Sequence, residues 1–268
     1  MLPGENLRLI LVIMKYELKI PNSQGQQLEV LQELPDKGDQ FPTVILVPGF
    51  GVDLHEYGYF DEITTLLLQN GFQTFRFSFS GTGKSQGNFE DMTIESQATE
   101  FKLIVDYVLR DRFTMPGHVG IFAQSFGASV VISALPITGI STFMFSGTQA
   151  FPGETLARHF KRQRGFNPEA VSKMERSDKT ITRIDPQFWR SEKRHNLVGK
   201  IRQITEPVLF IHGSKDKKVK GAEALLLYNA VTSKKKFHLV ENSNHSFTGR
   251  FRPKVLELIV EWFEETLR

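Results

Sequence analysis

The stretch from His118 to Ser129 constrains the fold of this chain more than any other. Apolar residues typical of a buried strand run into Ala-Gln-Ser-Phe-Gly, and small residues that begin a helix follow. A strand, a very tight turn and a helix in this order would place Ser125 at the tip of the turn. Such a turn needs small residues two positions before and after the serine, because these crowd each other, and here they are Ala123 and Gly127. The pattern predicts an exposed Ser125 hydroxyl, with the backbone N–H of Phe126 directed toward the same point.

A serine hydroxyl becomes a nucleophile when a base accepts its proton and a third group orients that base. The apolar run from Pro207 to Gly213 leads into a polar loop with Asp216, and a strand that begins at Lys236 leads into a loop with His245. We predict that His245 takes the Ser125 proton and later delivers it to the leaving group. Asp216 would hold the imidazole in the correct tautomer and stabilise the imidazolium.

Other interpretations of these residues stay open. Small-x-Ser-x-Gly recurs by chance, and Asp216 lies among lysines at 215, 217 and 218, so it could be a solvated loop residue. His212 ends a strand beside this loop and is interpreted as structural. The other histidines fall in predicted strands, in an inserted segment or in a loop: His118, His238, His159, His195 and His55. We favour His245 because it follows the last predicted strand.

Five segments together resemble the α/β-hydrolase superfamily of serine esterases. They are Val47–Gly51, Arg76–Gly87, Ala123–Gly127, His212–Asp216 and Asn244–Phe247, in the order Ser, Asp, His for the three reactive residues. The resemblance covers the chain from about Tyr16 onward. It is closest to bacterial serine esterases with a helical lid, such as the cinnamoyl and feruloyl esterases. It implies an α/β fold with a mostly parallel central sheet flanked by helices, a covalent acyl-enzyme, and no metal or organic cofactor.

The same resemblance implies an oxyanion hole made of the backbone N–H groups of Phe50 and Phe126. Each such donor stabilises the developing oxyanion by about 3 kcal/mol. The family usually has His-Gly where this chain has Pro48-Gly49, and glycine where it has Ala123. Neither change removes a catalytic atom, because the donors belong to the backbone. Phenylalanine at both donor positions would also narrow and dry the site.

Alternating and apolar patterns predict the order of strands and helices. Two alternating segments on either side of Asn22–Gly25 predict an antiparallel hairpin at a sheet edge. The predicted parallel strands include 44–47, 73–79, 119–123, 141–146, 207–213 and 236–240, and the predicted helices are 57–70, 93–110, 126–135, 223–231 and 253–267. Strands that alternate with helices indicate a parallel sheet wound on both faces. We therefore expect one α/β-hydrolase domain over residues 1–268.

Residues 148–205 break this alternation and predict an inserted helical lid. Between Gln149 and Thr205 the chain has 13 cationic and six acidic residues, a net charge of +7, whereas the rest sums to −4. The basic segment could be a solvated helical surface, a site for anionic substrates, or a surface for a membrane or an acidic partner. Its aromatic residues should mostly pack the lid onto the body, with one or two lining the pocket: Phe151, Phe160, Phe166, Phe188 and Trp189.

Composition and the remaining motifs exclude several classes. The chain has no cysteine, which excludes disulfides, thiolate metal sites and a cysteine nucleophile. The apolar run Leu9–Met14 is too short to span a membrane, so we interpret it as a strand or an extension and expect a cytoplasmic protein. We expect no integral membrane segment and no nucleic-acid partner, and a homodimer stays open. The segment Ser78–Ser85 resembles a phosphate-binding loop, but it lacks the first glycine and a helix directly after it.

These observations predict a serine hydrolase that cleaves a small-molecule carboxylic ester with an apolar or aromatic acyl group. The 23 phenylalanines suggest the apolar preference. A thioesterase or an acyl-peptide hydrolase would use the same Ser-His-Asp triad and stays an alternative. A non-catalytic binding protein on the hydrolase fold and a nucleotide-binding protein are further alternatives, which reactivity and nucleotide binding would distinguish.

Overall fold

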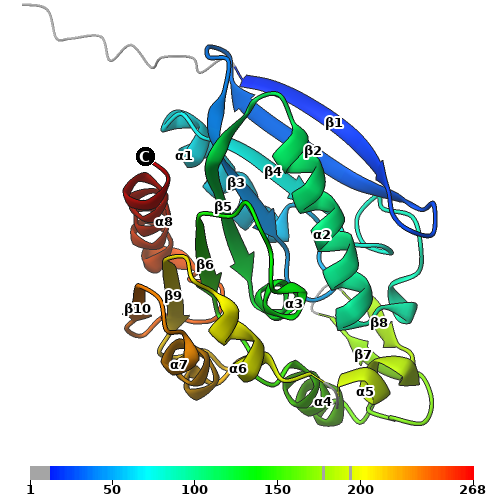
Figure 1. The fold of residues 1–268 in the computed structure, drawn as a ribbon. Coiled ribbons are helices and arrows are strands. Elements are labelled where there is room, and N and C mark those ends of the chain that lie inside the picture. The colour runs from blue at the N-terminus through cyan, green and yellow to red at the C-terminus, as the bar shows by residue number, and fades with distance from the viewer. Residues whose placement is uncertain (1–12, 177–178, 193–194) are drawn as a thin grey trace, which may run out of the picture.

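The computed structural model describes residues 13–176, 179–192 and 195–268, and its centre is an eight-stranded sheet (Figure 1). The strands lie in the order β1-β2-β4-β3-β5-β6-β9-β10. Their bounds are β1 Ile13–Pro21, β2 Gln27–Pro35, β3 Phe41–Val47, β4 Gln73–Phe77, β5 Thr114–Gln124, β6 Thr142–Ser146, β9 Val208–Gly213 and β10 Lys235–Val240. The six strands from β4 to β10 are parallel, and β2 runs antiparallel to both of its neighbours. The predicted hairpin, β1 with β2, forms one edge of the sheet, as expected.

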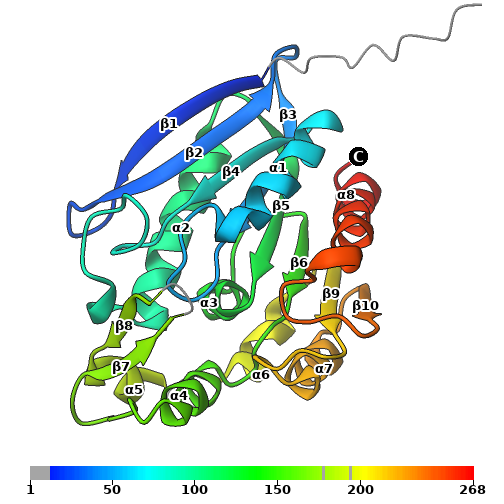
Figure 2. The ribbon, with the colours of Figure 1, turned by 180° about the vertical axis from the view of Figure 1, so that it is seen from behind.

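Helices cover both faces of the sheet and enclose two apolar clusters. The helices α1 (Tyr59–Gln69) and α8 (Arg252–Leu267) lie on one face, toward the viewer in Figure 2. The opposite face carries α2 (Ile94–Arg110), α3 (Phe126–Ala134) and α7 (Gly221–Ala230). The helix α2 begins at a capping box, in which the Thr93 side chain and the Ser96 side chain each bond the other residue's backbone N–H. This arrangement is the α/β-hydrolase fold that the sequence predicts.

The insertion between β6 and β9 lies beyond the carboxyl ends of the parallel strands (Figures 1 and 2). It contains α4 (Pro152–Arg162), β7 (Ser172–Glu175), β8 (Ile181–Ile184), α5 (Pro186–Glu192) and α6 (Leu197–Lys200). The strands β7 and β8 form an antiparallel pair that the sequence did not predict. Each has only four residues, too few for an alternating pattern to be recognised.

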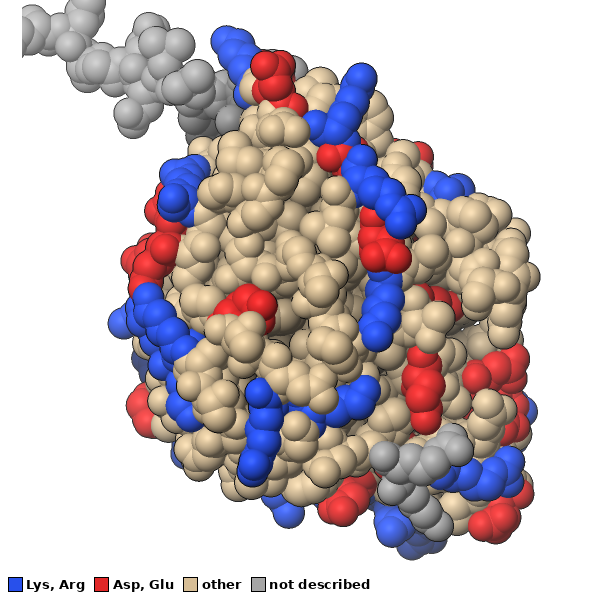
Figure 3. Space-filling view, in the orientation of Figure 1, with Lys and Arg blue, Asp and Glu red and all other residues tan. Residues whose placement is uncertain are grey.

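One face of the molecule carries charges of both signs. On the face shown in Figure 3, Lys and Arg side chains are interspersed with Asp and Glu and do not gather into one patch. Of the apolar run Leu9–Met14, residues 9–12 lie outside the described part of the chain. Within residues 13–176, 179–192 and 195–268, no helix combines the length and apolar character that crossing a bilayer requires.

Candidate active site

Ser125 lies in the turn between β5 and α3, at the centre of the sheet. Its φ of +54° is in the left-handed region, which few residues other than glycine adopt. Its backbone N–H donates to the carbonyl oxygen of Ser146 in β6 at 2.7 Å. A Cβ at Gly127 would overlap the carbonyl oxygens of Val47 and Pro48. The end of β3 therefore requires a glycine at this position, a constraint that the sequence did not reveal.

Asp216 and His245 come together from the loops after β9 and β10. The His245 Nδ1 lies 2.6 Å from Asp216 Oδ2, and the Asp216 side chain is 1% exposed. The second carboxylate oxygen, Oδ1, accepts the backbone N–H groups of Lys218 and Val219 at 2.8 and 2.9 Å. Burial raises the pKa of Asp216, but the hydrogen bond from His245 and these contacts outweigh it and hold the pKa below its usual value. The carboxylate is therefore ionised and faces the imidazole.

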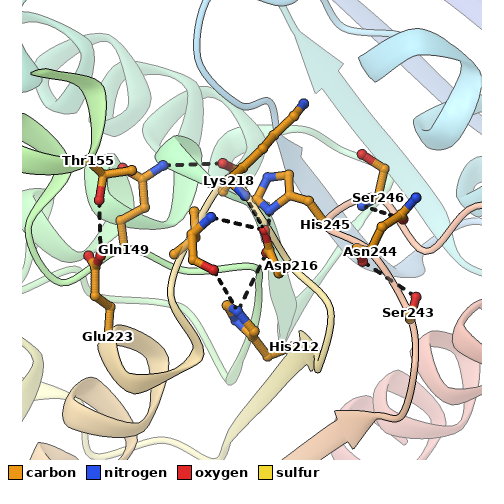
Figure 4. Close-up of polar contacts among 12 residues, drawn as sticks. Gln149, Thr155, His212, Asp216, Lys218, Glu223, Ser243, Asn244, His245 and Ser246 are labelled. Atoms are coloured by element: carbon orange, nitrogen blue, oxygen red, sulfur yellow. Dashed lines mark hydrogen bonds and ion pairs between the residues drawn. The ribbon is translucent and has the colours of Figure 1, made fainter. Parts of the chain in front are cut away.

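His212 lies on the other side of the same carboxylate, and Asp216 lies between the two histidines in Figure 4. Its Nε2 is 3.5 Å from Asp216 Oδ2 and 3.3 Å from the carbonyl oxygen of Val219, and the residue is fully buried. Burial lowers the pKa of His212, which keeps the ring neutral. His212 thus contacts the loop that carries Asp216, which is consistent with a structural role.

The Ser125 hydroxyl and His245 line one cavity, but among the described residues no hydrogen bond joins them. Ser125 Oγ instead accepts from Gln149 Nε2 at 3.3 Å. Gly147, with a φ of +58°, lies against the His245 ring, where a side chain would collide with the imidazole. The serine and the histidine therefore face the same space without contact, a common state of such pairs before substrate binds.

The cavity in front of Ser125 has a volume of about 300 Å³. The body contributes mainly the turn after β3 and the loops that carry Ser125, Asp216 and His245, whereas the insertion contributes the side chains Leu156, His159, Met174 and Arg176. None of the five insertion aromatics lines it. Phe160, Phe166 and Phe188 each pack against Trp189 instead, so the expectation that one or two would reach the pocket is wrong.

The two phenylalanines of the predicted oxyanion hole differ in their surroundings. The Phe50 ring lines the cavity, while the Phe126 ring is fully buried and packs against Phe50 and Phe188 with ring-centre distances of 5.5 and 6.2 Å. Among the described residues, neither backbone N–H has a hydrogen-bond acceptor. Only Phe50 therefore narrows the cavity with its side chain, and both amides remain available as hydrogen-bond donors.

Side chains hold the turn after β3 on both sides of Phe50. The Glu56 carboxylate accepts the backbone N–H of Gly49 at 2.7 Å, and Arg176 Nη2 donates to the carbonyl oxygen of Phe50 at 3.1 Å. Burial raises the pKa of Glu56 to about 7, although the Gly49 N–H and the nearby cations Lys218 and Arg176 oppose this effect. The turn that carries the candidate oxyanion donor is thus bonded to one carboxyl group and one guanidinium.

Sequence reasoning missed three polar groups of this site. Glu56 and Arg176 have no motif around them, and they reach the turn from a 3-10 helix and from the insertion. Gln149 could have been found, because it follows β6 at the carboxyl end of the sheet, where such folds bind ligands. Glu223 in α7 anchors the insertion. It accepts the Thr155 hydroxyl at 3.0 Å (Figure 4) and the Ala150 N–H at 3.2 Å.

The segment Ser78–Ser85 does not form a phosphate-binding loop. The Glu29 carboxylate accepts the backbone N–H of Lys84 at 2.8 Å and the Ser78 hydroxyl at 3.0 Å, so a side chain of β2 occupies the donors of this loop. A three-residue 3-10 helix at Phe89–Asp91 follows, rather than an α-helix directly after the loop. Among the described residues, no group of three or more His, Asp or Glu side chains could hold a metal ion.

With this geometry in place, comparison with known proteins identifies the family. A model of the prolyl oligopeptidase family matches residues 59–268. The chain belongs to the prolyl oligopeptidase family. It is a serine hydrolase of the α/β-hydrolase superfamily, as the resemblance in the sequence predicts. None of the curated proteins is similar enough in sequence to match the chain.

Solved structures share the fold at low sequence identity. Est1E from Butyrivibrio proteoclasticus, solved with ferulic acid bound, superposes with a TM-score of 0.77 at 20% identity, covering 93% of this chain and 98% of its own. The α/β hydrolase GrgF from Penicillium sp. sh18 has a TM-score of 0.77 at 14% identity, with 95% and 99% covered. The Pyrococcus furiosus esterase Pf2001 has a TM-score of 0.73 at 18% identity, with 96% and 92% covered. The fold therefore extends over nearly the whole chain, insertion included.

Proposed function

We propose that this protein hydrolyses carboxylic esters of small molecules through a covalent acyl-enzyme on Ser125. The observation that carries the proposal is the 2.6 Å hydrogen bond between His245 and the buried Asp216 carboxylate, in the wall of the cavity that Ser125 enters. A charged, water-excluded orienting group beside an imidazole is costly to bury, and it is typical of a general base that must become cationic during a reaction.

The reaction would proceed in two steps. Ser125 Oγ attacks the ester carbonyl carbon while its proton passes to His245 Nε2, and the carbonyl oxygen becomes an oxyanion near the N–H groups of Phe50 and Phe126. The tetrahedral intermediate collapses, the C–O bond to the alcohol breaks, and His245 donates its proton to the leaving alcohol. Water then attacks the acyl-enzyme with His245 as base, which releases the acid and restores Ser125.

The cavity lining supports an apolar acyl group of modest size. Phe50, Leu156 and Met174 supply apolar surface beside Ser125, and a volume of about 300 Å³ accommodates a short alkyl chain or one aromatic ring. Because Arg176 and Lys218 also line the cavity, an acyl group with a terminal carboxylate should be tested beside the apolar ones.

A labelling experiment and the kinetics of one further variant test the proposal. We expect a fluorophosphonate probe to label the wild type, but neither Ser125→Ala nor His245→Ala. Asp216→Asn should keep the fold and lower kcat by about 10³–10⁴-fold, because the imidazole would be held in the wrong tautomer. A folded Asp216→Asn variant that retains kcat within tenfold of the wild type would contradict the proposal.

The family match favours one second candidate, hydrolysis of a short acylated peptide by the same residues. Both reactions would form an acyl-enzyme on Ser125, with different acyl groups, so only substrate competition separates them. The panel should compare p-nitrophenyl acetate, butyrate, octanoate and hemisuccinate, an aromatic acyl ester, a thioester and an N-acylated aminoacyl p-nitroanilide. A kcat/KM for the anilide that exceeds every ester would establish the peptidase.

A further inference from the structure

The peptide group that carries the candidate oxyanion donor lies between two peptide groups that the side chains of Glu56 and Arg176 hold. The donor is the N–H of the Gly49–Phe50 peptide. The preceding peptide, Pro48–Gly49, donates its N–H to Glu56 Oε2 at 2.7 Å. The following peptide, Phe50–Gly51, accepts from Arg176 Nη2 at 3.1 Å. Two fixed neighbours leave little freedom for the central peptide, so its N–H orientation is set by both contacts.

Arg176 connects the turn at Phe50 with the insertion, because it belongs to the insertion and not to the body. It follows β7, and its other two nitrogens donate to Thr182 Oγ1 in β8 and to the Tyr57 hydroxyl in the body, at 2.5 and 3.1 Å. Its guanidinium also lies over the Phe50 ring, 5.8 Å from the ring centre. The guanidinium therefore joins the hairpin of the insertion to the oxyanion turn at several points.

The backbone at Glu56 and Tyr57, on the other side of the Phe50 turn, is strained. Glu56 and Tyr57 have φ values of +46° and +56°, and such values cost about 1–3 kcal/mol for a residue other than glycine. This conformation lets Glu56 bond Gly49 and lets Tyr57 bond Arg176. Strain of this kind persists where surrounding contacts enforce it, and it concentrates at functional sites.

We propose that Arg176 and Glu56 are positioning residues that hold the Phe50 N–H in its oxyanion-binding orientation, so that seating of the insertion on the body completes the oxyanion hole. The inference rests on the proposed ester hydrolysis. It adds that the insertion sets the rate of the chemical step as well as covering the cavity. Neither residue touches the reacting atoms, and each acts through the backbone of Gly49–Gly51.

A matched control is available on the same hairpin. Arg183 in β8 forms an ion pair with Glu90 of the body at 2.7 Å, and so it also ties the insertion to the body without contact to the oxyanion turn. With an ester of an uncharged acyl group, Arg176→Gln should lower kcat by about 10–100-fold, with KM within threefold, because loss of an aligned oxyanion donor affects the transition state more than bound substrate. Arg183→Gln should leave both constants within threefold. Arg176→Lys, which keeps one donor, should recover part of kcat.

Variants of Glu56 give a second, independent test of the inference. Glu56→Gln keeps an oxygen acceptor for the Gly49 N–H and should stay within fivefold of the wild-type kcat, whereas Glu56→Leu removes it and should resemble Arg176→Gln. If Arg176→Gln or Glu56→Leu does not fold, Arg176→Lys and Glu56→Gln still test the inference through inhibition by a trifluoromethyl ketone, which forms an oxyanion on Ser125. We expect Arg176→Lys to weaken this inhibitor at least fivefold, while the binding of the product acid stays unchanged.

The outcomes separate this inference from the proposed function. Fluorophosphonate labelling and ester turnover of the wild type are measured first, and their absence would contradict the proposed function itself. With an active wild type, equal losses in Arg176→Gln and Arg183→Gln would overturn the positioning role, as would a rise in KM at constant kcat. Unchanged trifluoromethyl ketone inhibition in Arg176→Lys would overturn it as well.

Discussion

Two turns meet at the candidate catalytic cavity, and contacts of different kinds hold them. The turn at Ser125 is fixed by backbone, through the bond from Ser125 N–H to Ser146 and the close approach of Gly127 to the carbonyls that end β3. The turn at Phe50 is held by the side chains of Glu56 and Arg176. Backbone contacts within a buried sheet change only when the sheet changes, whereas side-chain contacts to an insertion change when the insertion moves. The turn at Ser125 is therefore a fixed part of the fold, and the turn at Phe50 is the adjustable part.

Among the variants that test this contrast, Gly127→Ala should have the largest effect. The new methyl group would overlap the carbonyl oxygens of Val47 and Pro48, which are backbone atoms at the end of a central strand and cannot move aside cheaply. We expect the free energy of unfolding to fall by about 1–3 kcal/mol, as is usual for overpacking. We expect kcat/KM to fall at least about 100-fold, because Phe126 N–H and Ser125 would shift together. Urea unfolding measures the free energy and ester kinetics measure kcat/KM. If kcat/KM of this variant equals that of the wild type, the Ser125 turn adapts to a change as easily as the Phe50 turn does.

Gly51→Ala makes the matching change in the turn at Phe50, with a smaller expected effect. Gly51 has a φ of +61°, and its Cβ would meet the ends of two flexible side chains, Arg176 and Phe89. Strain of about 1 kcal/mol and displacement of Arg176 should lower kcat by about tenfold. Since the alanine acts by displacing the guanidinium, combining it with Arg176→Ala should add little to the loss from Arg176→Ala alone. Fully additive losses in this double-mutant cycle would argue against a link through Arg176.

The same contrast explains what the sequence could predict. The strand that ends at Gln124, the small residues around Ser125, and the Asp216 and His245 loops are encoded in short segments, and periodicity and chain order identify them. The contact of Asp216 with His245 follows because parallel strands end at the same edge of the sheet. The backbone-held part of the site was therefore predictable residue by residue.

The side-chain-held part was not predictable, because it depends on where distant segments meet. Arg176 is one of 13 cationic residues between Gln149 and Thr205, and nothing in its neighbours marks it as the one that reaches Phe50. Glu56 reaches Gly49 only because two successive residues adopt left-handed backbone conformations, which no propensity favours for Glu and Tyr. The aromatic residues of the insertion were misplaced for the same reason, since composition cannot distinguish packing on Trp189 from lining a cavity.

The smallest expected effect concerns the stability of the insertion, through Glu192 at the end of α5. Burial raises the pKa of Glu192 from 4.5 to about 8, and the Glu95 carboxylate adds to this, while a hydrogen bond from the Gly153 N–H opposes it. The folded state thus binds more protons than the unfolded state between pH 4.5 and about 8, so stability falls as pH rises through this window. Glu192→Gln removes the titrating group, and we expect its Tm to exceed that of the wild type by at least about 3 °C at pH 9 and to match it at pH 5.

This variant also separates the two turns, because it changes the insertion without touching either. At pH 9 the wild-type insertion is destabilised by the ionised Glu192, so kcat for an ester should rise about twofold in Glu192→Gln through better seating of Arg176. The hydrogen bond between Asp216 and His245 lies in the body and should not change in Glu192→Gln. The NMR resonance of the His245 imidazole proton can measure this. A Tm gain of equal size at pH 5 and pH 9 would mean that Glu192 is already ionised at pH 5. The hypothesis that the insertion becomes less stable as the pH rises would then be wrong. Glu192→Gln would also no longer serve to change the turn at Phe50 while the turn at Ser125 stays unchanged.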